Sequence, residues 1–344
     1  MKKNVFRAVV GALLLMGAAH SGMAAERQMK MSLWVPPAHP IVADLEEWAQ
    51  SLSQASEGTI KATIYPAQQL GKAADHYDMA RDGIVEYAMV APGYSPGRFP
   101  IWSLIELPFS FSNSTSGARA LHEWYLKYAP VEMKDVHVCL VSMHHPGVFH
   151  FKDNPVRMPA ELARRRIRPA GPGMAQFITQ LGGTNVQASL PEVRQLAERG
   201  VVDGVTFAWD IFVIGADPIL KHHMDEPMYV TSQVHAINKR FYDSLDDRQK
   251  KALDEHCTPE WSERINQGWA REELAARDRL KNSPEHDVYT LTDTERAAWR
   301  EAARPLVDQA HEAVQKRYRL DAKEIHQELL KTLEKHNARY QSNG

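Results

Sequence analysis

The sequence predicts an α/β protein with largely parallel sheets, and three observations lead to this fold class. Segments with the two-residue periodicity of strands alternate with segments of helical periodicity along the first two thirds of the chain. The part that follows, from Asp246 onward, is rich in the helix formers Ala, Glu, Arg, Lys and Leu. The 344 residues are 44% hydrophobic, which is enough for a well-packed core and about two domains.

The first 24 residues have the pattern of a secretory signal peptide. Lys2, Lys3 and Arg7 form a positive segment, residues 8–19 are apolar or glycine, and small residues precede a cleavage point after Ala24. A membrane anchor needs about 20 apolar residues, and this run is shorter. We therefore expect an exported mature chain.

The elements of the first half follow from periodicity and from breaks. Apolar residues at helical spacing over 41–52 predict a helix, and alternation over 60–64 predicts a strand, with Gly58 between them. A polar helical stretch and a further strand come next, before a loop rich in proline and glycine. These three segments are 73–82, 84–90 and 92–97.

The second half repeats the alternation and then becomes helical. Strands are predicted at 136–141, 167–169 and 201–207, with a helix at 174–181. The helix-forming composition near the C-terminus predicts three further helical stretches, the second interrupted by Pro305. They cover 246–282, 292–318 and 321–338.

Charge, cysteine count and motifs exclude several kinds of protein or make them less expected. Lys plus Arg total 41 against 43 Asp plus Glu, so no basic field points to nucleic acid. Cys139 and Cys257 could form one bridge or none, and cannot make a disulfide-rich scaffold or a four-thiolate zinc site. The nucleotide-binding, zinc-protease and hydrolase motifs GxGxxG, GxxxxGK[ST], HExxH and GxSxG are missing, which lowers the expectation of those chemistries.

Three stretches, taken in order and spacing, carry a family resemblance. The first joins His39-Pro40, residues 57–60 and 65–71 to Leu107-Pro108-Phe109. The second is Arg166-Ile167-Arg168-Pro169 followed by Leu181-Gly182-Gly183, and the third runs from Pro191-Glu192-Val193 to residues 200–204. Together they resemble the DctP-type solute-binding proteins of tripartite ATP-independent periplasmic (TRAP) transporters, over nearly all of the mature chain.

The resemblance implies a two-lobed periplasmic binding protein fold with a ligand cleft between the lobes. Lobe I would hold 26–146 plus 234–275, and lobe II 147–233 plus 276–338. It also implies a periplasmic monomer that delivers a small-molecule carboxylate to TRAP membrane permease subunits, with an ion gradient and no ATP. It implies neither a cofactor nor a nucleic-acid partner.

Arg168 is the principal candidate for ligand binding. In the predicted strand Arg166-Ile167-Arg168, alternate side chains face opposite sides, so that Ile167 enters the core while Arg168 faces a crevice at the carboxyl end. A guanidinium matches both oxygens of a carboxylate. The resemblance places the family's carboxylate-binding arginine at this residue, and we expect the preceding arginines 164–166 to form a solvated edge.

The other candidate ligand-binding residues come from spacing within the resemblance. Relatives that bind large sugar acids use a second arginine, an asparagine and an acidic residue, and the matching positions here are Val148, Phe207 and Ala91, with Trp34 at the first strand. This apolar lining predicts a hydrophobic or aromatic monocarboxylate, or a 2-oxo or 2-hydroxy acid, rather than a polyol. Trp209 would add an aromatic face, and His145 lies just before the expected crossing Pro146-Gly147.

Two other functions stay open. A periplasmic ligand sensor of the same fold would use the same residues. A secreted enzyme is less favoured, because no nucleophile, base and orienting group can be assembled and no catalytic residue is assigned. The pairs His144-His145 and His222-His223 look like metal ligands, but adjacent residues of a strand face opposite sides, so no metal site is expected.

Overall fold

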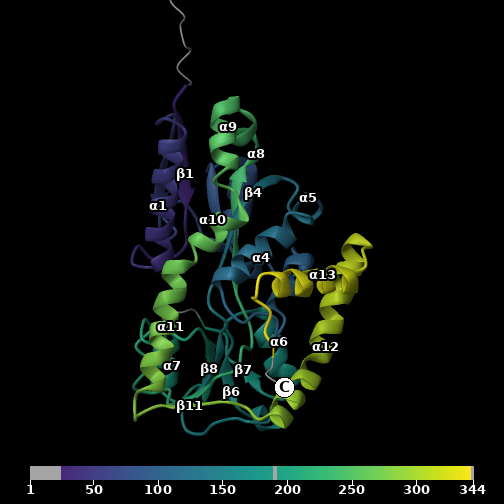
Figure 1. The fold of residues 1–344 in the computed structure, drawn as a ribbon. Coiled ribbons are helices and arrows are strands. Elements are labelled where there is room, and N and C mark those ends of the chain that lie inside the picture. The colour runs from purple at the N-terminus through teal and green to yellow at the C-terminus, as the bar shows by residue number, and fades with distance from the viewer. Residues whose placement is uncertain (1–24, 189–191, 342–344) are drawn as a thin grey trace, which may run out of the picture.

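The computed structural model describes residues 25–188 and 192–341. The expected signal peptide, at residues 1–24, and Pro191 of the third family stretch lie outside the described residues. The described chain builds two separate β-sheets, each with helices packed on it (Figure 1). This confirms the predicted α/β class and the two-lobed fold.

The first sheet has five strands in the order β2-β1-β3-β10-β4. Strand β1 pairs in parallel with β2 and β3, whereas β10 is antiparallel to both of its neighbours. Buried Met29, Met31 and Ile60 place the apolar side of this sheet against helix α1. The strands are β1 (Arg27–Ser32), β2 (Ile60–Tyr65), β3 (Tyr87–Val90), β4 (Val136–Met143) and β10 (Ser232–Asn238).

The second sheet has six strands in the order β11-β9-β5-β8-β6-β7. Strand β5 is antiparallel to β8 and β9, and the other pairs are parallel. The strands are β5 (Val148–Phe151), β6 (Arg166–Arg168), β7 (Thr184–Asn185), β8 (Gly204–Phe207), β9 (His222–Met224) and β11 (Asp287–Tyr289).

In each sheet one strand is antiparallel to both of its neighbours, β10 in the first sheet and β5 in the second. Each of them is the first strand formed after the chain crosses from the other sheet. The chain leaves β4 through residues 144–147 to reach β5, and it returns from β9 through residues 225–231 to reach β10. The two crossings are joined by backbone hydrogen bonds from Gly147 N to Tyr229 O (2.8 Å) and from Met228 N to Gly147 O (2.9 Å). The sheets are therefore connected by a paired ribbon of chain.

Helices of the first half cover both sheets. Helix α1 begins at Pro40, where the ring of His39 accepts a hydrogen bond from Ile41 N, and it buries Trp48 and Leu52 on its sheet-facing side. The helices before β9 are α1 (Pro40–Ala55), α2 (His76–Asp82), α3 (Pro100–Ser103), α4 (Thr115–Tyr125), α5 (Ala129–Glu132), α6 (Pro172–Gln180) and α7 (Val193–Glu198). Short 3-10 helices lie at Ala73–Asp75, Pro92–Tyr94, Leu104–Glu106 and Pro159–Leu162.

The C-terminal part is mostly helical, as predicted, but two details of the prediction are wrong. The stretch 246–282 divides into three helices, since Thr258 with Pro259 begins a new helix and Asn266 bonds to neighbouring backbone. Pro305 does not interrupt α12, whose burial of Trp299, Ala303 and Leu306 around it offsets the lost hydrogen bond. The helices are α8 (Lys239–Asp243), α9 (Asp247–Asp254), α10 (Pro259–Arg264), α11 (Gln267–Lys281), α12 (Asp293–Tyr318) and α13 (Ala322–Lys335).

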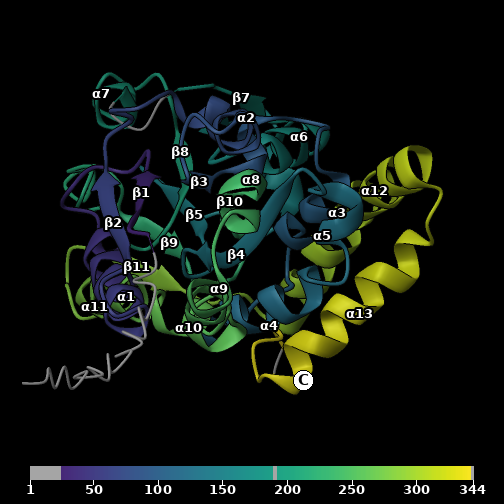
Figure 2. The same cartoon turned by 90° about the horizontal axis from the view of Figure 1, so that it is seen from above.

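Helices α11 and α12 connect the two halves along their sides (Figures 1 and 2). Helix α11 packs on α1 and on β11, and α12 packs on α3 and on α6. The predicted lobe boundaries group 276–338 with lobe II. The structure has α13 packed on α4 beside the first sheet, where Trp124 Nε1 donates to Ile325 O.

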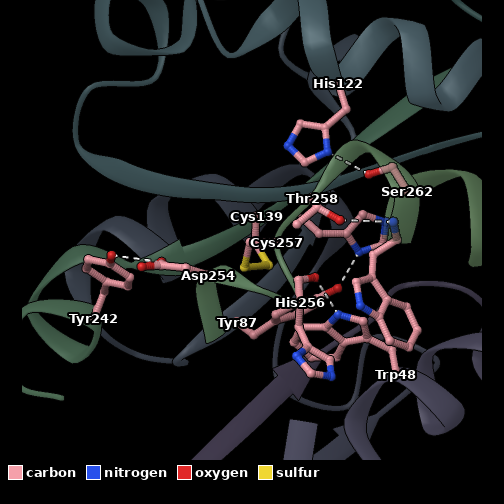
Figure 3. The surroundings of a disulfide bond; sticks show 12 residues. Trp48, Tyr87, His122, Cys139, Tyr242, Asp254, His256, Cys257, Thr258 and Ser262 are labelled. Atoms are coloured by element: carbon pink, nitrogen blue, oxygen red, sulfur yellow. Dashed lines mark hydrogen bonds between the residues drawn. A yellow bond between two sulfur atoms is a disulfide. The ribbon is translucent and has the colours of Figure 1, made fainter. Parts of the chain in front are cut away.

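One disulfide joins Cys139 of β4 to Cys257, between α9 and α10. The bridge lies close to Trp48, Tyr87 and His256, at the apolar core between the first sheet and helix α1 (Figure 3). It links positions 118 residues apart and ties the helical C-terminal part to the sheet. Of the two possibilities left open by the sequence, the structure has the bridge.

Within the described ranges, no helix is both long and apolar enough to cross a bilayer.

Candidate ligand-binding site

The candidate site lies where the carboxyl ends of parallel strands from both sheets face each other. Trp34 follows β1 by two residues, Ala91 directly follows β3, and Arg168 is the last residue of β6. Ser232 and Gln233 join them from the amino end of antiparallel β10, which lies at the same edge of the sheet. Ligands of open α/β sheets bind at such edges.

Arg168 is a buried cation without a carboxylate partner. Its side chain forms a hydrogen bond from Nε to Ala188 O (3.3 Å), and it makes no ion pair with any described residue. Burial lowers the pKa of Arg168, while the hydroxyls of Tyr94 and Tyr229 lie near enough to oppose this shift. Removing a cation from water without a counter-charge is costly, so the fold holds this guanidinium ready for an anion.

Arg166 provides the contrast two residues earlier on the same strand. Its side chain is exposed and forms an ion pair with Asp203, which also accepts a hydrogen bond from Arg166 N (2.8 Å). This pairing explains why one arginine of the strand is available to a ligand and the other is not.

A cavity of about 60 Å³ lies near Arg168, which is not one of its lining residues but is close to Tyr94, which is. It is lined from both lobes, by residues following β1 and β3 on one side and by the segment between β6 and α6 on the other. Trp34 and Tyr94 form an aromatic wall, with ring centroids 5.6 Å apart in an edge-to-face arrangement. The lining residues are Trp34, Ala91, Gly93, Tyr94, Glu106, Ala170, Gly171, Pro172, Thr231, Ser232 and Gln233.

Two polar atoms of this lining are buried and have no hydrogen-bond partner among the described residues. They are Trp34 Nε1 and Ser232 Oγ. Buried polar groups are nearly always paired in folded proteins, so unpaired ones at a cavity indicate groups that a ligand or water completes. Both can donate a hydrogen bond.

A buried chain of hydrogen bonds fixes the amide of Gln233. Tyr87 Oη lies 2.6 Å from His235 Nδ1, His235 Nε2 lies 2.8 Å from Ser142 Oγ, and Ser142 Oγ donates to Gln233 Oε1 at 2.9 Å. The Gln233 oxygen already accepts a hydrogen bond from Ser142, while its amide N–H groups make no hydrogen bond to a described residue and are free to donate to the cavity. The polar lining is therefore rich in donors, which suits a carboxylate.

Glu106 is the exception to this pattern. It lies at the end of the 3-10 helix Leu104–Glu106, and burial raises the pKa of its carboxyl to about 7. It also lines a neighbouring groove of about 320 Å³ between the 92–107 segment, the start of α6 and helix α12. Gly93, Glu106 and Pro172 line both spaces, so they separate the cavity from the groove.

The sequence-predicted site residues divide between two places. Trp34 and Ala91 line the cavity beside Arg168, whereas His145, Val148 and Trp209 line a different cavity of about 470 Å³ next to the C-terminal segment. Phe207 lies opposite Val148 in the β5–β8 pair and is half-buried against an apolar cluster that includes Val205 and Trp209.

The cavity lined by His145, Val148 and Trp209 is dominated by internal ion pairs. Arg277 donates to both carboxylate oxygens of Asp225 at 2.7 and 2.6 Å and lies over the ring of Trp209. Since both of its arginines are already paired, Arg277 with Asp225 and Arg339 with Glu334, this cavity offers a carboxylate less than the one near Arg168 does.

Protein contacts account for His144, His222 and His223, whereas His145 Nδ1 is buried without a hydrogen-bond partner among the described residues. His144 bonds to His145 O and to Thr231 N, and His223 bonds to His150 and His286. No group of three His, Cys, Asp or Glu side chains in the described chain could hold a metal ion.

Sequence reasoning missed Tyr94, Glu106, Tyr229 and Gln233. Tyr94 belongs to the proline-rich and glycine-rich loop, and Glu106 directly precedes the Leu107-Pro108-Phe109 stretch, so both lay beside features that had been recognised. Gln233 is polar within a strand whose residues are all buried, a pattern typical of a functional or network role.

Two lobes with a small cavity lined from both of them, and a buried arginine without an ion-pair partner near it, are the features of a two-lobed solute-binding protein. Residues 31–317 match bacterial extracellular solute-binding protein family 7, DctP, and the chain belongs to this family. Among curated relatives, the C4-dicarboxylate-binding periplasmic protein DctP of Rhodobacter capsulatus is 24% identical, over 91% of this chain and 96% of that protein.

Solved structures agree with this assignment. A TRAP solute-binding protein from a marine metagenome, described as specific for aromatic acids and crystallised with 3-hydroxybenzoate, is 27% identical with a TM-score of 0.81 and covers 91% of this chain and 100% of that one. A TRAP solute-binding protein of Rhodoferax ferrireducens with copurified benzoate is 25% identical with a TM-score of 0.80, covering 90% of this chain and 98% of that one. Both of these structures hold an aromatic carboxylate, whereas the curated relative is named for C4-dicarboxylates.

Proposed function

We propose that this chain is the periplasmic solute-binding subunit of a TRAP transporter. It captures a small organic acid between its lobes and delivers it to the membrane permease. The expected signal peptide and the family support export, and the family supports binding rather than catalysis and a monomeric state. A ligand sensor of the same fold would bind by the same residues, and a transport assay separates the two.

The observation that carries the proposal is the buried Arg168 without an ion-pair partner, beside a cavity lined from both lobes. A carboxylate would neutralise this cation with two parallel hydrogen bonds. The adjoining donors, Trp34 Nε1 and Ser232 Oγ, would complete the site.

The proposed ligand is a hydrophobic or aromatic monocarboxylate, or a 2-oxo or 2-hydroxy acid. The aromatic pair Trp34 and Tyr94 suits a flat apolar body. Val148 lines the other cavity and Phe207 lines neither cavity, so the support for this ligand class within the site is the wall of Trp34 and Tyr94. Relatives that hold benzoate and 3-hydroxybenzoate support this class, while the dicarboxylate-binding relative supports a rival one.

A thermal-shift screen of organic acids tests the ligand class. An acid at 100 times its dissociation constant should add about 2.7 kcal/mol to the free energy of unfolding. We expect aromatic or branched-chain monocarboxylates to raise the melting temperature. A response to sialic or uronic acids alone would contradict this ligand class.

Calorimetric titration of the best acid tests the anchor. Arg168→Ala should weaken binding by about 2–5 kcal/mol, because a buried charge pair is broken. The matched control is Arg166→Ala, since Arg166 lies on the same strand but is exposed and already paired with Asp203. We expect this control to bind normally, and unchanged affinity in Arg168→Ala would contradict the assignment.

A further inference from the structure

The cavity beside Arg168 has one acidic residue among its described lining, Glu106. The other hydrogen-bonding groups there can donate: Trp34 Nε1, Ser232 Oγ and the Gln233 amide. A carboxylate in the wall of an anion-binding site repels the anion. It can favour binding only if it contacts a different part of the ligand.

The carboxyl of Glu106 makes no hydrogen bond and no ion pair with any residue in the described ranges. Glu132 shows how this fold treats a buried carboxylate of purely structural role. It accepts hydrogen bonds from Ile101 N (2.7 Å), Trp102 N (2.9 Å) and Tyr125 Oη (2.9 Å). Glu106 has no such set of donors, and its burial alone accounts for its raised pKa.

The backbone that carries Glu106 is firmly held. Its neighbours Leu104, Ile105 and Leu107 are buried in the core, and Glu132 caps the start of the preceding helix α3. A Cβ atom at Gly93 would lie 3.2 Å from Glu106 Oε1, so the loop backbone closes over the carboxyl from the other side. The group is therefore fixed at the partition between the cavity and the groove lined by α12.

In its ionised form, which dominates above its pKa of about 7, the unpaired carboxyl of Glu106 favours a ligand group that donates a hydrogen bond and disfavours a second negative charge. Building on the proposed function, we propose that Glu106 is the specificity-determining residue for the end of the ligand away from its carboxylate. It binds a hydroxyl group there and excludes dicarboxylates. Arg168 and Glu106 together then select a monocarboxylate that carries a separate hydroxyl group.

Calorimetry with two matched series of acids tests this inference. The first series is benzoate, 3-hydroxybenzoate and isophthalate, and the second is butyrate, 4-hydroxybutyrate and succinate. Within each series the three acids differ only in the distal group. In the wild-type protein we expect the hydroxy acid to bind about tenfold more tightly than its unsubstituted parent. The dicarboxylate should bind more weakly than the parent.

Glu106→Gln keeps the shape of the side chain and removes its charge. This variant should reduce the preference for the hydroxy acid and improve binding of the dicarboxylate by about tenfold. Glu57→Gln is the control, because Glu57 is an exposed carboxylate of the same lobe that pairs with Arg248. Its selectivity should match that of the wild type, and thermal melts check that both variants are folded.

The outcomes separate the two proposals. If acids of either series bind in an Arg168-dependent way but wild-type selectivity ignores the distal group, the role of Glu106 is wrong and the proposed function stands. Tight binding of succinate or isophthalate to the wild-type protein would also show that the role of Glu106 is wrong while the proposed function stands. If no member of either series binds, the proposed ligand class fails and this inference fails with it.

Discussion

Histidine 235 is an example of a single residue whose burial links stability to pH. It lies fully buried between Tyr87 and Ser142, and burial lowers its pKa to about 3. The folded protein keeps this ring neutral at a pH where the unfolded chain, with a histidine pKa near 6.5, takes up a proton. The stability contributed by neutral His235 is therefore complete above pH 6.5 and is lost as the pH falls toward 3.

We predict that His235→Asn reduces the dependence of stability on pH. Between pH 7.5 and 5.5, the wild-type free energy of unfolding should fall by about 1 kcal/mol on account of this residue, and the variant should lack that part of the loss. Urea denaturation at the two pH values measures it. Tyr87→Phe removes the neighbouring hydroxyl but keeps the histidine, so it should retain the wild-type pH dependence. An equal dependence in His235→Asn would contradict the prediction.

Only some of the individual site residues could be predicted from the sequence. Arg168 could be found because strand periodicity and the family stretch both pointed to it. Glu106, Tyr94 and the Gln233 network could not be found by spacing, since the approach of the 92–107 loop to the start of α6 is a tertiary contact. Local patterns predict which face a side chain takes, but not which distant segment it meets.

Among the elements, the five predicted strands lie close to β2, β3, β4, β6 and β8, because their apolar periodicity is set by local sequence, whereas no ranges were predicted for β1, β5, β7, β9, β10 and β11. The division of 246–282 into three helices depends on Asn266 meeting the backbone of β4, a contact between distant segments. The pairing of Cys139 with Cys257 across 118 residues likewise depends on the packing of β4 against the C-terminal helices.

The ribbon that joins the two sheets has no room for a side chain at Gly147. A Cβ atom there would lie 2.4 Å from ring atoms of Tyr229, which is buried and lies near Arg168. Gly147 therefore permits the two crossings to approach each other, and the position of Tyr229 depends on it.

We predict that Gly147→Ala destabilises the protein by about 1–3 kcal/mol, the usual cost of overpacking, and weakens acid binding as well. Chemical denaturation and calorimetry measure the two effects. Gly173→Ala is the matched control, because a Cβ atom at Gly173 meets nothing within 4 Å and this residue also lies near the cleft. If Gly147→Ala keeps the stability and affinity of the wild type, the ring of Tyr229 can move aside without cost, and the prediction is wrong.

At the scale of the whole molecule, the connections between the lobes determine how they can move. The paired ribbon of residues 144–147 and 225–231 is short, and two helices pack on elements of both lobes: α11 on α1 and β11, and α12 on α3 and α6. Such connections permit hinge motion of two lobes while keeping the lobes facing each other. The cavity between the lobes, at about 60 Å³, is well below the 300–1,000 Å³ typical of ligand pockets.

Because an organic acid does not fit into a space of this size, we predict that the lobes separate to admit the ligand and close on it. Closure is favoured only by contacts that the closed state makes and the open state lacks, and an acid held between Arg168 on one lobe and the Trp34 and Ala91 side of the other supplies them. Small-angle scattering should show a smaller radius of gyration when the best acid from the thermal screen is added at saturation. Arg166→Ala should respond in the same way, whereas Arg168→Ala at the same acid concentration should keep the radius of the free protein. A radius that is identical with and without ligand in the wild type would mean that the acid binds without moving the lobes, and the entry route would then have to lie through the groove beside α12.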